Sequence, residues 1–172
     1  MSLRAAFIGI VILLGQLILA PAMALEPLTH PSGPVLLSVS GKIAVGNTPG
    51  GRAEFDLAML QSLPQSRIVT STIWTDGMQS FEGVLVSDLL ARLGAKAVEI
   101  NATAANDYAI RIPVSDATAH GALIAYAANG APLPPQNKGP LWIVYPYDQD
   151  EALRTERFLA QSIWNLETMS LD

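Results

Sequence analysis

Apolar and small polar residues alternate over much of the chain. Within residues 35–45, for example, Leu37 and Val39 alternate with Ser38 and Ser40, which is the period of a half-buried β-strand. Short stretches rich in apolar or β-branched residues follow it along the chain. We predict strands at 35–45, 54–55, 67–75, 78–84, 98–103, 108–112, 123–127 and 141–145.

Turn-forming residues separate the predicted strands. The Asp-Gly dipeptide at 76–77 turns the chain from 67–75 into 78–84, so these two strands should form a hairpin. The Asn-Gly dipeptide at 129–130 is a second tight-turn sequence. Residues 113–116 are expected to open an irregular connection.

Two segments carry the residues that begin and end helices. Asp56 can cap a brief helix that runs through Leu60 and is stopped by Pro64. Ser87 is expected to cap a second helix, which presents leucines on one face and ends at Gly94.

The end of the chain fits two descriptions. Residues 157–166 could form a helix or a strand, and the alternation around Ile163 and Trp164 favours a strand. The whole pattern then gives about seven to nine short strands and two helices, which predicts the α+β class, with one compact domain built on mixed or antiparallel sheets.

The first residues have the features of a secretory signal. Arg4 precedes a long apolar run that ends in Ala22-Met23-Ala24, so residues 1–24 are predicted to be a cleavable signal peptide rather than a transmembrane anchor. Residues 25–34, with three prolines, should be a flexible leader, and 35–172 the folded domain. We expect a periplasmic protein without membrane insertion after cleavage.

Composition excludes several classes of partner and chemistry. With 15 acidic and 10 basic residues and no cluster of Lys or Arg, a nucleic-acid partner is not expected. The chain has no cysteine, so it has neither a disulfide nor a thiolate for metal binding or catalysis. Two isolated histidines make a poor zinc set, and no bound metal is expected.

Aromatic and amide side chains gather near the predicted strand ends. Such groups suit a flat heterocycle, because rings stack on its faces while amides or carboxylates bind its edge. The alternative is that the aromatic side chains simply fill the core. The set comprises Trp74, Phe81, Asn106, Asp107, Tyr108, Trp142, Tyr145, Tyr147 and Trp164. Among the aromatic residues Trp74 is the strongest ligand candidate, because it lies beside a turn at a strand end.

An ordered series of short motifs runs from about Gly41 to the C-terminus. In chain order they read WTDG at 74–77, FEGVL at 81–85, NDY at 106–108, NGAPL at 129–133, KGPLW at 138–142 and IW at 163–164. In this order they resemble the molybdopterin-binding domain of the sulfite-oxidase family. The resemblance implies an α+β domain of mixed sheets. In the family's enzymes molybdenum is held by the cofactor's dithiolene and one protein cysteine, near the end of the strand that corresponds to 68–75.

The sequence is still more similar to a branch of small secreted proteins that keep this fold without the cysteine. Some of these are periplasmic pterin-binding proteins that partner with the periplasmic sensory part of membrane signalling proteins, including those that make or degrade cyclic di-GMP. The resemblance therefore implies a pterin or molybdopterin-like ligand without a metal, and a protein partner of that kind. The residues that match pocket positions are Thr72, Trp74, Asn106, Asp107, Tyr108 and Lys138.

The resemblance implies different roles within this set. Thr72 and Trp74 match the strand-end segment that faces the cofactor, and the loop motif at 106–108 lines the same pocket. Lys138 matches a position where a basic residue can meet the cofactor's anionic tail. Asp107 could bind the amino-pyrimidinone edge of a pterin, or it could only hold its own turn through an Asx-type bond.

Three functions remain open from the sequence. The leading one is a non-enzymatic periplasmic pterin-binding protein that signals to a membrane partner. An alternative is a molybdopterin-dependent oxidoreductase in which a Ser, Thr or water oxygen replaces the cysteine ligand. The third is an interaction module whose pocket binds nothing.

Overall fold

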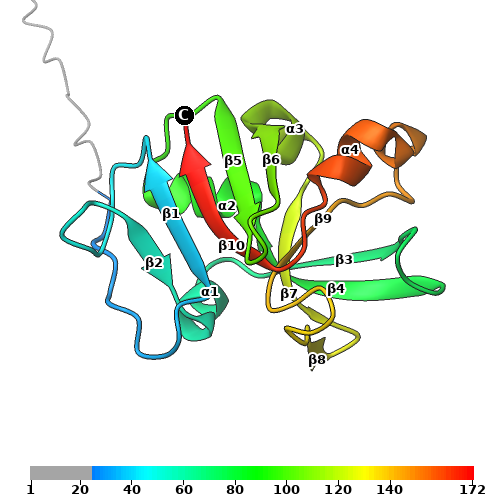
Figure 1. Cartoon of the computed structure of the whole chain (residues 1–172), viewed down its shortest axis with the longest axis horizontal. Helices are drawn as coiled ribbons and strands as arrows, with labels where there is room; N and C mark the ends of the chain where they lie inside the picture. Colours follow the sequence, from blue (N-terminus) through cyan, green and yellow to red (C-terminus); the bar gives the residue numbers. More distant parts are fainter. Residues whose placement is uncertain (1–24) are drawn as a thin grey trace, which may run out of the picture.

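The computed structural model describes residues 25–172, which form two β-sheets with short helices around them (Figure 1). The first sheet is mixed, because β1 and β10 run parallel while its other strand pairs are antiparallel. Its strands lie in the order β2 (Ala53–Phe55), β1 (Leu37–Gly41), β10 (Leu166–Leu171), β5 (Glu99–Ala104) and β6 (Ala109–Pro113).

The second sheet is antiparallel throughout, with β7 at its centre. One side of β7 pairs with β4, and β3 lies beyond β4 as the edge strand. The other side of β7 pairs with β8 and β9 at different registers. The strands are β3 (Ser66–Ser71), β4 (Met78–Leu85), β7 (Leu123–Ala128), β8 (Ala131–Pro132) and β9 (Trp142–Val144). The predicted α+β class is thus confirmed.

One hydrophobic core joins the two sheets. It includes Leu37 of β1, Phe81 of β4, Leu89 and Leu123, which are all almost completely buried. The helices around this core are α1 (Leu57–Ser62), α2 (Val86–Leu93), α3 (Val114–Ala119), the 3₁₀ helix η1 (Glu151–Arg154) and α4 (Glu156–Gln161).

The two predicted helices exist, but only one has the predicted cap. Asp56 caps α1, because its Oδ1 accepts a hydrogen bond from Met59 N at 2.8 Å. The predicted cap at Ser87 is wrong, since α2 begins at Val86 and has no side-chain cap. Instead β4 continues directly into α2, and Val86 N donates to Ala122 O at 2.9 Å, so a neighbouring strand end satisfies a donor that a cap would serve.

Three local predictions are corrected by the structure. Residues 156–161 form α4 rather than a strand, because Phe158 and Gln161 share one buried helical face, and the alternation around Trp164 reflects an extended link with a single bridge to Trp142. Residues 114–119 form α3 instead of an irregular connection. The β3–β4 hairpin is confirmed, but its loop spans residues 72–77 rather than a two-residue turn.

Residues 25–34 contain no helix or strand and lie along the domain. The backbone N–H groups of Ser32 and Gly33 donate to Asp56 Oδ2 at 2.7 and 2.8 Å, and Arg92 donates to Pro27 O. The predicted signal peptide, residues 1–24, lies outside the described part of the chain. None of the helices formed within residues 25–172 has the length and apolar character needed to cross a membrane.

Candidate ligand-binding site

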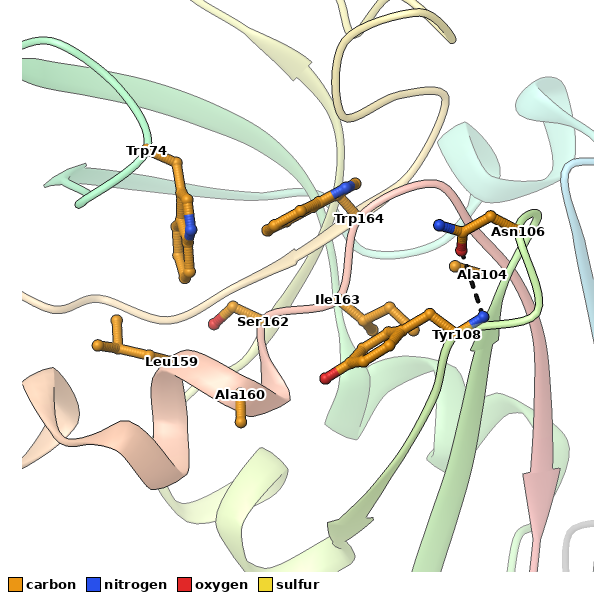
Figure 2. A pocket seen from close by; sticks show the side chains of 9 residues that line it. All are labelled: Trp74, Ala104, Asn106, Tyr108, Leu159, Ala160, Ser162, Ile163 and Trp164. Carbon is orange, nitrogen blue, oxygen red and sulfur yellow. Dashed lines mark hydrogen bonds between the residues drawn. The ribbon is translucent and has the colours of Figure 1, made fainter.

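A cavity of about 320 Å³ opens between the β3–β4 loop, the β5–β6 loop and the segment that joins α4 to β10 (Figure 2). We call it the apolar cavity, because its lining surface is mostly apolar. Its walls are Trp74 from the first loop, Asn106 and Tyr108 from the second with Ala104 at the end of β5, Leu159 and Ala160 of α4, and Ser162, Ile163 and Trp164 from the segment that follows α4.

Three aromatic side chains frame this cavity and remain partly open to solvent. Trp74 and Trp164 meet edge to face, with ring centroids 5.6 Å apart and planes inclined by 70°. Trp164 is 39 % exposed and Tyr108 50 %. Burial of apolar aromatic surface is favourable in free energy. These partly exposed rings therefore offer apolar surface that a bound flat molecule would cover.

The β5–β6 loop positions the Asn106 amide at the cavity, beside the Tyr108 side chain. Asn106 Oδ1 accepts from Tyr108 N at 3.3 Å, which is an Asx-type bond. Since its oxygen is used by the backbone, Asn106 has its Nδ2 group available to donate. Asp107 has a positive φ of 65°, and its N–H donates to Ala104 O. The Asx-type bond of this turn therefore belongs to Asn106, and the exposed Asp107 lines no wall of the cavity.

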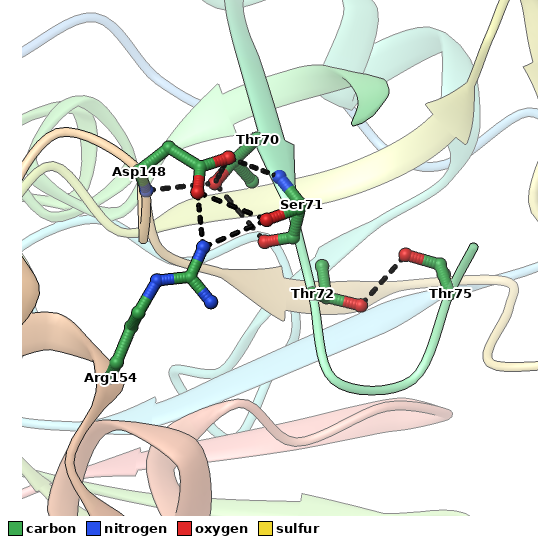
Figure 3. A network of polar contacts seen from close by, with 6 residues as sticks. All are labelled: Thr70, Ser71, Thr72, Thr75, Asp148 and Arg154. Atoms are coloured by element: carbon green, nitrogen blue, oxygen red, sulfur yellow. Dashed lines mark hydrogen bonds and ion pairs between the residues drawn. The ribbon is translucent and has the colours of Figure 1, made fainter. Parts of the chain in front are cut away.

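Hydroxyl groups hold the loop that carries Trp74. Thr72 Oγ1 accepts from Trp74 N at 3.1 Å. It also lies 2.8 Å from Thr75 Oγ1 (Figure 3). Thr72 is buried and lines neither this cavity nor its neighbour described below. Its hydrogen bonds therefore hold the loop that carries Trp74.

The base of the same loop is clamped by Asp148. Its carboxylate accepts from Ser71 N and from the hydroxyls of Thr70 and Ser71, and it pairs with Arg154 (Figure 3). The backbone N–H of Ser71, with these other donors, lowers the pKa of Asp148 from 3.8 to about 2. The clamp is therefore fully charged at neutral pH.

A buried polar network fixes the α4 wall. Gln161 Oε1 accepts from the Tyr145 hydroxyl and its Nε2 donates to Asp116 Oδ2, both at 2.8 Å. Next along the chain, Ser162 contacts the Tyr147 hydroxyl through Oγ. Burial raises the pKa of Tyr147 to about 12 and also raises the pKa of Tyr145, so both phenols stay neutral and hold this wall through hydrogen bonds.

A second, wider cavity of about 470 Å³ lies on the other side of Trp74. We call it the Lys138 cavity. Trp142 and Phe81 line it together with prolines of the 131–134 segment. Lys138 Nζ is 5.8 Å from the centre of the Trp142 ring and donates to Asn137 Oδ1 at 3.1 Å.

The structure brings half of the predicted site residues together. Trp74, Asn106 and Tyr108 line the apolar cavity, whereas Lys138 lines the other one, and Thr72 and Asp107 line neither. Their roles toward a ligand stay predictions. Sequence reasoning missed the wall contributed by the end of α4, because that segment was interpreted as a strand.

The donors present do not fit molybdenum. The chain has no cysteine, and no group of three His, Cys, Asp or Glu side chains gathers in the described residues. The apolar cavity also contains no carboxylate or imidazole. A pterin ring fits this lining better, because it needs aromatic surface and hydrogen bonds rather than a soft ligand.

Comparison with known proteins identifies a family for this chain. A family model described as the oxidoreductase molybdopterin binding domain matches residues 51–148, more than half of the chain. No curated protein matches it. The matched range contains all six predicted site residues, while the α4 wall lies beyond it. The chain therefore belongs to the oxidoreductase molybdopterin-binding domain family.

Proposed function

We propose that this chain is a periplasmic binding protein for a pterin or molybdopterin-like ligand, and that it reports the ligand to the periplasmic domain of a membrane signalling protein. The main support for a ligand of this class is the apolar cavity, with its aromatic frame and the Asn106 donor. Family membership and the lack of cysteine support binding without a thiolate–molybdenum bond.

The cavity favours the bicyclic ring as the part of the ligand that it encloses. Its volume of about 320 Å³ lies at the small end of the range of about 300–1,000 Å³ for ligand pockets. The ring would lie against Trp74, Trp164 and Tyr108. An acceptor on its edge, a carbonyl oxygen or ring nitrogen, would face Asn106 Nδ2.

Asn106→Asp tests this orientation. The aspartate keeps an oxygen for Tyr108 N, and hence the turn, but replaces the donor with a charged acceptor. Affinity for added pterin, followed by the quenching of tryptophan fluorescence, should fall about three- to tenfold, as expected for one partly exposed hydrogen bond. Gln61→Glu, the same change at an exposed position of α1, should bind like the wild type. Equal affinity of Asn106→Asp and the wild type would remove Asn106 from the site.

The oxidoreductase alternative is separated by the natural ligand. Protein purified from its native periplasm should release a fluorescent pterin and contain no stoichiometric molybdenum. The Thr72 hydroxyl, an oxygen that could replace the cysteine, already contacts Thr75 and Trp74 N. Stoichiometric molybdenum would overturn the proposal in favour of an enzyme.

A further inference from the structure

The strand β3 is an edge strand, and its register shows which of its backbone groups point outward. Val69 lies opposite Ser80 of β4. Ser80 uses both its backbone groups on the other side, because its N–H donates to Asn129 Oδ1 and its C=O accepts from Asn129 N. The two residues therefore form a non-hydrogen-bonded pair, and the N–H and C=O of Val69 point away from β4.

The same reasoning applies two residues to either side. The N–H of Ser71 points outward and is taken by Asp148 (Figure 3), which closes that end of the edge. Arg67 lies two residues before Val69, so its backbone groups also point outward. Within residues 25–172 no hydrogen bond joins the backbone of Arg67 or Val69 to a group beyond the sheet. The backbone N–H and C=O groups of Arg67 and Val69, two residues apart on one strand, are therefore left without a hydrogen-bond partner within residues 25–172.

A groove of about 570 Å³ lies beside this open edge. One side is formed by β3 and the other by the end of α3 and the segment around η1. Its lining is Ser66, Arg67, Ile68, Leu85, Thr118, Ala119, His120, Gly121, Pro146, Gln149, Asp150 and Leu153. The groove thus combines an apolar floor with polar side chains of both charges. Val69, next to it, is 49 % exposed.

We propose that an extended segment of a protein partner pairs with β3 at Arg67 and Val69 as an additional strand, and that one of its polar side chains enters the groove. Addition of a strand uses main-chain hydrogen bonds for affinity and adjacent pockets for specificity. A single extended segment matches the four open backbone groups of Arg67 and Val69. The inference rests on the proposed protein partner and is independent of the pterin.

Val69→Pro tests the pairing directly. Proline removes the outward N–H without touching a bond to β4, and an edge strand tolerates it. Peptides of twelve residues would be selected from a random phage-displayed library on the whole protein and measured by calorimetry. They should protect the Val69 amide from hydrogen exchange, lose about tenfold or more in affinity with Val69→Pro, as expected for a lost bond and a blocked edge, and bind Val69→Ala like the wild type.

Each other outcome overturns the proposal. No selected peptide, or peptides that bind Val69→Pro as well as Val69→Ala, would show that the edge is not used. A concentration-dependent dimer that Val69→Pro abolishes would assign the edge to a second copy of the chain. Arg67→Pro replaces Val69→Pro if the latter loses its circular-dichroism spectrum. Pterin affinity, measured on the same variants, should stay unchanged, which separates this test from the proposed ligand.

Discussion

The two cavities that share Trp74 differ in chemistry. The apolar cavity is smaller, and its α4 wall is tied down by buried hydrogen bonds through Gln161 and Ser162. The Lys138 cavity is wider, and polar side chains, the carboxylate of Asp76 and the cation of Lys138 lie among its lining residues. A single indole therefore separates a place suited to a flat ring from a place suited to a charged substituent. If one ligand occupies both cavities, Trp74 should contribute to the binding of both parts of that ligand. Each of the other lining residues should contribute to the binding of only one part.

Removing the shared indole should have the largest effect. Trp74→Ala would join the two cavities and delete the ring that meets both Trp164 and Trp142 edge to face. Stacking of a base on an aromatic side chain contributes about 1–3 kcal/mol, so pterin affinity should fall about 5- to 150-fold in a fluorescence titration. Trp74→Phe should restore much of it. Unchanged affinity of the alanine variant would place the ligand elsewhere.

Breaking the α4 wall should affect only the apolar cavity. Gln161→Ala leaves the Tyr145 hydroxyl and Asp116 Oδ2 buried without their shared partner, and an unsatisfied buried group costs about 1–3 kcal/mol. The free energy of unfolding in urea should drop by about 2 kcal/mol, and pterin affinity should fall with it. Gln61→Ala, at an exposed position, is the control and should change neither. A loss of stability with full affinity would show that this wall does not contact the ligand.

The difference between local and long-range contacts explains which parts of the fold the sequence could predict. Alternation identifies most of the strands because it is a local property, although it does not identify β10 (Leu166–Leu171). Asp56 likewise caps α1 by bonding to Met59, three residues away. The helices α3 and α4 have six residues each, too few to be stable alone. Long-range contacts hold them in place, among them the burial of Phe158 and the hydrogen bond between Asp116 and Gln161, 45 residues apart. That contact is invisible to a local pattern.

The candidate site shows a similar division. Trp74 is found because it stands beside a turn, and Asn106 and Tyr108 because they belong to a motif. In this turn Asp107 adopts the left-handed conformation and Asn106 makes the Asx-type bond. Because both Asn and Asp residues can adopt that conformation, the sequence does not show which of the two makes the bond. The α4 wall depends on long-range contacts and could not be predicted in this way.

The clamp at Asp148 supports the loop of Trp74 and gives a test with pH. Its folded-state pKa of about 2 lies below the ordinary 3.8, so its stabilisation is complete above pH 3.8 and is lost as the pH falls through about 2. In Asp148→Asn the free energy of unfolding should depend less on pH within this window. The same variant should lose a small part of its pterin affinity.

Asp56 provides the matched control, because N–H groups led by that of Met59 also lower its pKa to about 2. Asp56→Asn should weaken the acid dependence in the same direction but leave pterin affinity unchanged, since Asp56 lines neither cavity. An acid dependence unchanged in Asp148→Asn would show that the clamp contributes nothing to stability.

Lys138 should have the smallest and most selective effect. Lys138→Met keeps a long apolar side chain at this position and removes the ammonium charge that lies over the Trp142 ring. A pterin with a phosphorylated side chain should bind about threefold more weakly at low salt, with a smaller difference as salt screens the charge, whereas unsubstituted pterin should bind as before. Lys96→Met, at an exposed position outside both cavities, should alter neither affinity. If Lys138→Met weakens both ligands equally, Lys138 contributes its shape rather than its charge, and Trp74 does not divide the site by chemistry.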